Sequence, residues 1–206
     1  MANSTFSGPV RSENGFETVS KNATTGAITI TSGNKMAVEA TASAGIEGTA
    51  AVYVTQVNRL KSDTDTNVNI VKTTIMIDLT GLKDGGTAGD IIGKDGSGVA
   101  FIGQVTTANQ GTVFGVTMTC LETPAGGSTD IDLFSATEGT GVNDTAITAL
   151  TETQIINAGA ASAGTMVAGG DIAADQFLYL VSQGTGDAAY TAGRFLIEIT
   201  GFDAAS

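Results

Sequence analysis

Short runs in which apolar and polar residues alternate recur from residue 27 to residue 202, and glycine-rich turns separate them. Alternation with a period of two places successive side chains on opposite faces of an extended chain, as in a β-strand with one covered face. No apolar stripe of helix length lies between the runs as a crossover helix would require. The pattern therefore predicts an all-β protein, an antiparallel β-sandwich with a jelly roll as the specific arrangement.

The composition agrees with this prediction. The 206 residues include 28 glycines and 2 prolines, and charged residues make up 15% of the chain, against roughly a quarter in ordinary soluble domains. Threonine is abundant beside valine and isoleucine, a mixture that suits a pleated, half-buried surface. The chain therefore favours strands joined by many turns.

The alternating runs define the expected strands and core. The strands are expected at residues 27–31, 49–60, 68–82, 98–107, 113–122, 129–136, 176–183 and 193–202. The side chains expected in the core are Ile75, Ile77, Leu79, Phe101, Phe114, Val116, Met118, Ile131, Leu133, Phe195, Ile197 and Ile199. Residues 138–175 are rich in glycine and alanine, and within them residues 146–156 fit a short helix and a strand equally well.

Two of these runs carry more detailed predictions. Residues 98–107 and 113–122 are expected to pair as a hairpin with one solvated face. Within residues 68–82 the apolar positions change parity between Ile70 and Ile75, which indicates a β-bulge or a bend near Val71.

The strand Phe177–Val181 is apolar on both faces. One face can enter the core, whereas the other needs a neighbouring subunit or a covering loop. This strand is one reason to expect a homo-oligomer.

Residues 1–26 lack sustained apolar periodicity and are rich in polar residues. We expect an extended N-terminal arm of residues 1–26 joined to a β-sandwich body of residues 27–206. Such an arm can lie along a neighbouring subunit or add to the edge of its sheet, and an unattached terminus is the alternative. The candidate partner-binding residues of the arm are Phe6, Val10, Arg11, Phe16 and Val19.

The net charge of −12 limits the partners. Nucleic-acid affinity comes from neutralising phosphates with Lys and Arg, and only 9 such residues are present, so no nucleic-acid partner is expected. No apolar run has the length that crosses a bilayer, so no membrane partner is expected either. The start of the chain lacks a basic region followed by an apolar one, and the single cysteine predicts no internal disulfide. These features fit assembly in a reducing cytoplasm.

The residue types needed for common catalytic sites are scarce. The chain has no histidine, which excludes Ser-His-Asp and Cys-His nucleophiles and imidazole metal sites. Cys120 lies on the apolar parity of its expected strand, so we expect a buried, inert thiol. We therefore expect a protein that is not an enzyme and that holds no cofactor.

Three further patterns resemble parts of known kinds of ligand site. The loop Gly184–Ala189 matches a dinucleotide-binding glycine pattern, but a strand follows it where a helix is required, so we expect a hairpin loop. Asp63 and Asp65 begin like a calcium loop, although the later ligands are missing. Asp130 and Asp132 share one side of a strand, and solvated outward charges are the expected reading, with ion binding left open.

Four stretches of the sequence resemble virion structural proteins of tailed phages, especially marine and cyanobacterial ones. They are Met1–Phe16, Thr119–Pro124, Thr129–Leu133 and Ala192–Glu198, which lie at both ends and in the middle of the chain. The resemblance implies a capsid decoration (cement) protein that binds the major capsid protein on the outside of the shell. It further implies a homotrimer that is made in the cytoplasm of the bacterial host, and it implies no catalytic residue.

Other functions remain open at this stage. A tail tube, tail fibre or head-fibre component is the nearest alternative. A carbohydrate-binding module on the virion surface is another, but sugar platforms usually use exposed aromatic rings. The chain has no tryptophan and only three tyrosines, Tyr53, Tyr179 and Tyr190. An enzyme is the most distant alternative.

Overall fold

The computed structural model describes the strands Thr18–Lys21, Ile28–Ser32 and Ala51–Leu60, the residues Ser43, Gly45 and Ile46, and residues 68–96 and 98–204. Side chains are described at residues 43, 45 and 46 and in residues 70–96 and 98–202. The chain divides into two units, residues 1–35 and residues 36–206, and each is treated by itself.

The first unit contains a two-stranded antiparallel sheet. Strand β1 (Thr18–Lys21) pairs with strand β2 (Ile28–Ser32), and Val19 lies opposite Ile30. Strand β2 is the strand expected at residues 27–31, but its partner lies inside the segment expected as an arm. The division into arm and body at residue 26 remains a prediction. Of the five candidate arm residues, Val19 lies in β1, and Phe6, Val10, Arg11 and Phe16 lie outside the described residues.

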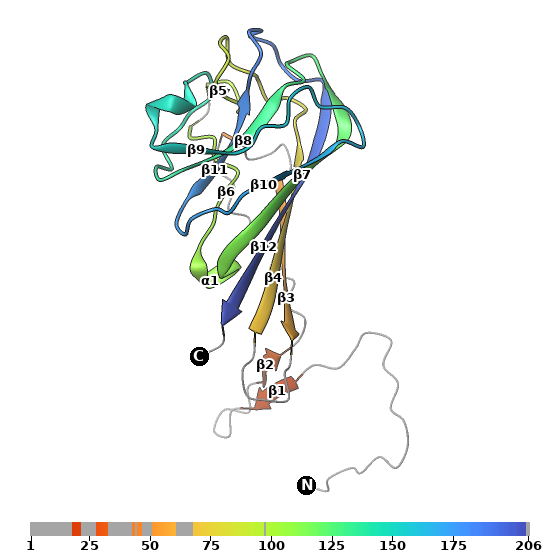
Figure 1. Ribbon diagram of the computed structural model, residues 1–206, viewed down its shortest axis with the longest axis vertical. Coiled ribbons are helices and arrows are strands. Elements are labelled where there is room, and N and C mark those ends of the chain that lie inside the picture. Colours follow the sequence, from red (N-terminus) through yellow and green to blue (C-terminus); the bar gives the residue numbers. More distant parts are fainter. Residues whose placement is uncertain are drawn as a thin grey trace, which may run out of the picture. The chain divides into compact units, whose positions relative to one another are not determined.

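The second unit contains two antiparallel sheets (Figure 1). Sheet 1 has the order β10-β7-β12-β4-β3, and its strands are Met166–Gly169, Thr112–Ala125, Ala192–Ala204, Val68–Asp78 and Ala51–Leu60. Sheet 2 has the order β5-β11-β8-β9, and its strands are Asp90–Ile91, Phe177–Ser182, Ile131–Ala136 and Glu152–Ile156. The short strand β6 (Gly103–Gln104) also pairs with β11.

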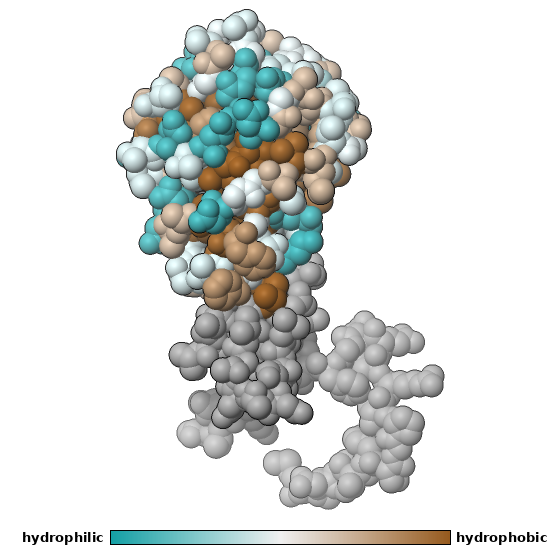
Figure 2. Space-filling model, viewed as in Figure 1, coloured by the Kyte–Doolittle hydropathy of each residue, from teal (hydrophilic) through white to brown (hydrophobic). Residues whose placement is uncertain are grey.

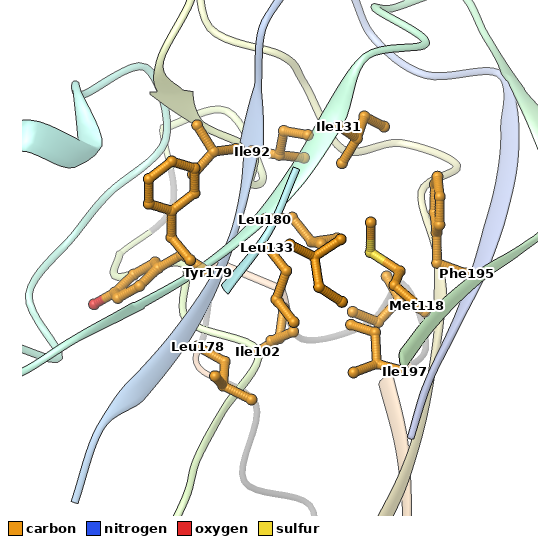
Figure 3. Close-up of a cluster of buried hydrophobic side chains, with 14 of the residues drawn as sticks. Ile92, Ile102, Met118, Ile131, Leu133, Leu178, Tyr179, Leu180, Phe195 and Ile197 are labelled. Atoms are coloured by element: carbon orange, nitrogen blue, oxygen red, sulfur yellow. The ribbon is translucent and has the colours of Figure 1, made fainter. Parts of the chain in front are cut away.

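The two sheets pack face to face around one core, which confirms the predicted all-β antiparallel sandwich. In Figure 3, Leu133 and Leu180 of sheet 2 face Met118 and Ile197 of sheet 1 across the interior. These side chains are at most 2% exposed. Burial of apolar area of this kind is the main favourable term in folding.

Sheet 2 is also covered on its other face, by loops of its own unit. The Tyr179 hydroxyl donates a hydrogen bond to the carbonyl of Glu138 at 2.7 Å and accepts one from the amide of Gly141 at 3.2 Å. The rings of Phe101 and Phe177 lie 4.9 Å apart. The second apolar face of β11 is therefore covered by loops, so that strand does not itself require a neighbouring subunit.

Ten of the twelve expected core side chains are buried, and two are not. Phe101 is half-buried against the core, and Phe114 is 53% exposed. The prediction for Phe114 is wrong because of a β-bulge. Gly115 pairs with Thr200 and Val113 pairs with Gly201, so Phe114 has no partner on β12 and the parity of β7 changes there. Val113 takes the inward position instead.

The predicted hairpin of residues 98–107 with 113–122 is also wrong. Strand β7 pairs with β12 and β10, whereas β6 pairs with β11 in the other sheet. Between them lies the helical turn α1 (Thr107–Gln110), which Thr106 caps by accepting a hydrogen bond from the amide of Asn109. The chain therefore passes from sheet 2 to sheet 1 at this point and does not fold back on itself.

Two remaining expectations have clear outcomes. Strand β4 pairs with β3 and β12 in unbroken register through Val71, so the bulge predicted there is absent.

Residues 146–156 form a 3₁₀ turn, η1 (Ile147–Ala149), followed by strand β9, so the strand alternative holds for the second half of the segment.

Candidate subunit-contact surface

The side of sheet 1 that faces away from the core is called the outer face here. Met166, Thr119, Leu196 and Met76 lie directly opposite one another on β10, β7, β12 and β4, and together they form one row across this face. Side chains that face each other across antiparallel strands have Cβ atoms about 4.5–5.5 Å apart. The row is therefore a continuous band in which three of four members are apolar.

Exposed apolar side chains concentrate on the outer face. Among the residues whose side chains are described, six large apolar side chains are exposed. Five of them are on the outer face, namely Met76, Phe114, Leu121, Met166 and Phe202, and the sixth is Val142 in a loop. In Figure 2, the visible side of the second unit exposes apolar residues between polar ones. Scattered exposed apolar residues are ordinary, whereas a gathering on one face indicates a contact surface.

Two β-bulges on β7 contribute to this surface. Phe114 is the unpaired residue of one bulge, and Leu121 is the unpaired residue of the other, since Cys120 pairs with Phe195 and Glu122 with Arg194. In each case the extra residue adds an apolar side chain on the solvent side and changes the parity of β7 at that point.

The charged groups of the outer face are paired with one another. Lys72 on β4 forms an ion pair with Glu198 on β12. Arg194 on β12 donates to Asp78 at 3.1 Å and lies 3.6 Å from Glu122. Hydrogen bonds from Thr80, followed by Arg194, hold the pKa of the Asp78 carboxyl below its usual value. The outer face therefore presents little unbalanced charge.

A buried carboxylate ties together the loops at one end of the sandwich. Asp84, which is 1% exposed, accepts hydrogen bonds from the amides of Ser128 at 2.7 Å and Ala188 at 2.8 Å. Ala188 lies in the loop Gly184–Ala189, which joins β11 of sheet 2 to β12 of sheet 1. The expectation of a hairpin loop is therefore wrong, because the two flanking strands belong to different sheets.

The pair Asp130 and Asp132 does not form the solvated face that was expected. Asp132 is 1% exposed, because loops cover this side of sheet 2, and its carboxylate accepts hydrogen bonds from Gln154 at 2.8 Å and the amide of Ala158 at 2.9 Å. Among the described residues, the buried Oδ1 of Asp130 has no hydrogen-bond partner. Burial, followed by the charge of Asp132, raises the pKa of the Asp130 carboxyl.

No metal centre is found in the part of the chain whose side chains are described, where no three His, Cys, Asp or Glu residues come together. Asp63 and Asp65 lie outside the described residues. Cys120 is buried as predicted, donates to the carbonyl of Glu122 at 3.2 Å, and has a pKa that burial raises. A raised pKa disfavours the thiolate that a nucleophile requires.

Comparison with protein-family models, curated proteins and solved structures finds no match to this chain. No helix in the described residues is long and apolar enough to span a membrane. A functional assignment therefore has to start from the fold and its surfaces.

The sequence predicts subunit contacts at the arm and at the strand Phe177–Val181, but it does not predict the outer face. The signal was present, because Met76 and Leu196 are apolar residues on the polar parity of their strands. A pair of cross-strand neighbours can be recognised only when the strand order and register are known, and β4 and β12 are more than a hundred residues apart along the chain.

Proposed function

We propose that this protein is a non-catalytic structural component of a tailed-phage particle, a capsid decoration protein that binds the shell of major capsid protein from outside. The observation that carries the proposal is the outer face, a broad exposed sheet surface with an apolar band and charges that pair across its strands, which suits assembly with other protein subunits, copies of this chain included. The proposal includes a homotrimer made in the cytoplasm of the bacterial host, and a jelly-roll arrangement of the sandwich. The sequence resemblance to phage virion proteins supports the same assignment.

The physical task of such a protein follows from mass action. A ligand that binds the assembled shell but not its free subunits stabilises the shell by the free energy of its own binding. Many copies with modest individual affinity are enough, because their contributions add over the particle. A rigid sandwich with contact surfaces suits this task and requires no reacting group.

The surroundings of the potentially reactive side chains support a structural role. Cys120 is buried, and the carboxylates of Asp84 and Asp132 are occupied by hydrogen bonds that hold loops together. The alternative of a carbohydrate platform loses support, because Tyr179 and Tyr190 are 0% and 2% exposed. Tyr53 lies in β3, where side chains are not described.

We assign the attachment to the shell to the N-terminal segment, through the apolar residues Phe6, Val10, Phe16 and Val19 together with Arg11. A segment with a few apolar anchors can bind along the surface of a neighbouring subunit, where backbone hydrogen bonds and the anchors both contribute. A chain shortened to begin at Ala27 would lose β1 and leave β2 without its partner. Substitutions in the full chain therefore give a cleaner test.

The test is sedimentation of the full-length protein with capsids that lack it. Phe6→Asp combined with Phe16→Asp is expected to weaken retention tenfold or more, which corresponds to about 1.4 kcal/mol. Phe6→Leu combined with Phe16→Leu is the matched control and should bind like the unchanged chain. Absence of retention for the unchanged protein would overturn the proposed function. Equal retention of the Asp variant would overturn only the assignment of the attachment to the N-terminal segment.

A further inference from the structure

The outer face of sheet 1 is exposed and also organised for contact. Its central row joins Met166, Leu196 and Met76 through Thr119, and its end carries the Phe114–Phe202 ring pair, with ring centroids 6.3 Å apart. Methionine and aromatic residues are enriched in the cores of protein interfaces, whereas charged residues are depleted in the cores and the rim is polar. The chemical character of the face is that of a protein contact.

The size of the face is sufficient for a specific contact. Strands β7, β12 and β4 run together along Arg194–Phe202, and β10 adds a short fourth strand. With about 3.3 Å per residue and about 4.8 Å between strands, they cover roughly 500 Å² of flat surface. This is the same order as the roughly 800 Å² that each partner buries in a standard interface.

The charge distribution indicates which partner the face accepts. Among the described side chains of β10, β7, β12 and β4, five charged groups lie on it, two basic (Lys72 and Arg194) and three acidic (Asp78, Glu122 and Glu198), and they pair with one another. These five groups carry −1 of the chain's total charge of −12, which leaves −11 for the rest of the chain. A basic partner protein would be attracted to the acidic surfaces of the chain outside this face. A partner as acidic as this chain is repelled least at the near-neutral outer face.

We infer that the outer face of β10, β7, β12 and β4 is the contact surface between copies of this chain. A second copy of this chain is an acidic partner of the kind that the charge distribution favours. It is present wherever the protein is, at the protein's own concentration. The apolar band supplies the contact, and the charges around it pair with one another and leave a net charge of −1, so little uncompensated charge has to be desolvated. This inference concerns self-association alone, so it stands or falls separately from shell binding.

The test is the mass of the full-length protein in solution, measured by light scattering and sedimentation over a range of concentrations. Met76→Lys combined with Met166→Lys places two cations at positions that are 41% and 63% exposed, so folding should be retained. The dissociation constant of the oligomer is expected to rise at least a hundredfold. Val142→Lys is the matched control, since Val142 is 39% exposed but lies in a loop away from sheet 1, and its oligomer should be unchanged.

Salt provides a second measurement. Raising the salt concentration screens the repulsion between two acidic copies, so association through the near-neutral face should hold or strengthen. Dissociation by salt would place the contact at ionic groups elsewhere and would overturn the inference. So would a protein that stays monomeric at every concentration, or a Met76→Lys, Met166→Lys variant that folds and associates like the unchanged chain. If the unchanged protein is monomeric and the Met76→Lys, Met166→Lys variant no longer binds capsids, the outer face contacts the shell and not a second copy of this chain.

Discussion

The rings of Phe114 and Phe202 lie 6.3 Å apart on the solvent side of sheet 1, although Phe114 belongs to a run whose alternation predicts burial. The bulge at Phe114 is responsible, because it shifts the parity of β7 and turns Val113 inward. The same bulge therefore removes a phenylalanine from the core and adds it to the outer face.

Truncating a buried and an exposed phenylalanine to alanine should distinguish the core side of sheet 1 from its outer face. Phe195 is 1% exposed, so Phe195→Ala is expected to lower the free energy of unfolding by roughly 3–5 kcal/mol. Phe114→Ala removes a ring that is 53% exposed and should cost less than about 1.5 kcal/mol, the value of an aromatic pair. Urea unfolding of both variants is the measurement. Equal costs would mean that the assigned faces of β7 are wrong.

A glycine on β12 permits close contact with the helical turn before β7. A Cβ atom on Gly201 would lie 2.0 Å from the carbonyl oxygen of Gln110, whereas one on Gly115 would meet nothing within 4 Å. Gly201→Ala is therefore expected to destabilise the protein by about 1–3 kcal/mol. Gly115→Ala is the matched control and should stay within about 0.5 kcal/mol of the unchanged chain. Thermal and urea unfolding should rank them in this order, and the reverse order would contradict the described contact between α1 and β12.

Loss of the buried carboxylate at Asp84 should loosen the loops that it joins. Asp84→Ala leaves the partly buried amides of Ser128 and Ala188 without an acceptor, so the free energy of unfolding should fall by about 1–3 kcal/mol. Asp187→Ala is the control, because Asp187 is 57% exposed and pairs with Lys83 at the surface. Such a surface pair contributes about 1 kcal/mol or less. If Asp84→Ala is as stable as Asp187→Ala, the structural role of the Asp84 carboxylate is refuted.

The Asp130 carboxyl should make stability depend on pH. Its pKa is raised in the folded protein above the ordinary value of 3.8, chiefly by burial. The folded state therefore holds this proton more tightly than the unfolded chain. The resulting stabilisation is complete below pH 3.8 and is lost as the pH rises through the folded-state pKa.

Asp130→Asn removes this ionisation while keeping the size of the side chain. It should raise the melting temperature at pH 7 relative to the unchanged chain and leave it nearly unchanged at pH 3. At pH 7 the free energy of unfolding of Asp130→Asn is expected to exceed that of the unchanged chain by about 1 kcal/mol or less, because Asp130 is only partly buried. The control is Asp95→Asn, at an exposed position in a loop, which should show no such pH-dependent gain. An equal shift at both pH values would exclude ionisation as the cause.

Local alternation was enough to predict the sandwich and most of its core. Ile75, Ile77 and Leu79 share a buried face, as their spacing indicates, and so do Phe195, Ile197 and Ile199. These positions follow from the period of a strand alone. By contrast, the neighbours of each strand depend on contacts between distant segments, so the pairing of β7 with β12 could not be obtained from the sequence of β7.

The errors occurred where tertiary structure overrides the local pattern. Asp132 looked like a solvated residue, but the neighbouring strand β9 and the loop after it supply its hydrogen-bond donors, Gln154 and the amide of Ala158. The second apolar face of β11 looked like a subunit contact, and the same kind of covering loop buries it. The outer face was missed because its apolar band assembles from β10, β7, β12 and β4, each of which contributes only one or two residues.

The most direct test of the proposed function is an electron cryomicroscopy reconstruction of the tailed-phage particle in which the proposal places this protein. The proposal predicts density for the sandwich on the exterior of the capsid, repeated at three-fold or quasi-three-fold positions, with copies meeting through the outer face of sheet 1. Density for the chain in the tail, or a particle in which the chain is absent, would contradict it.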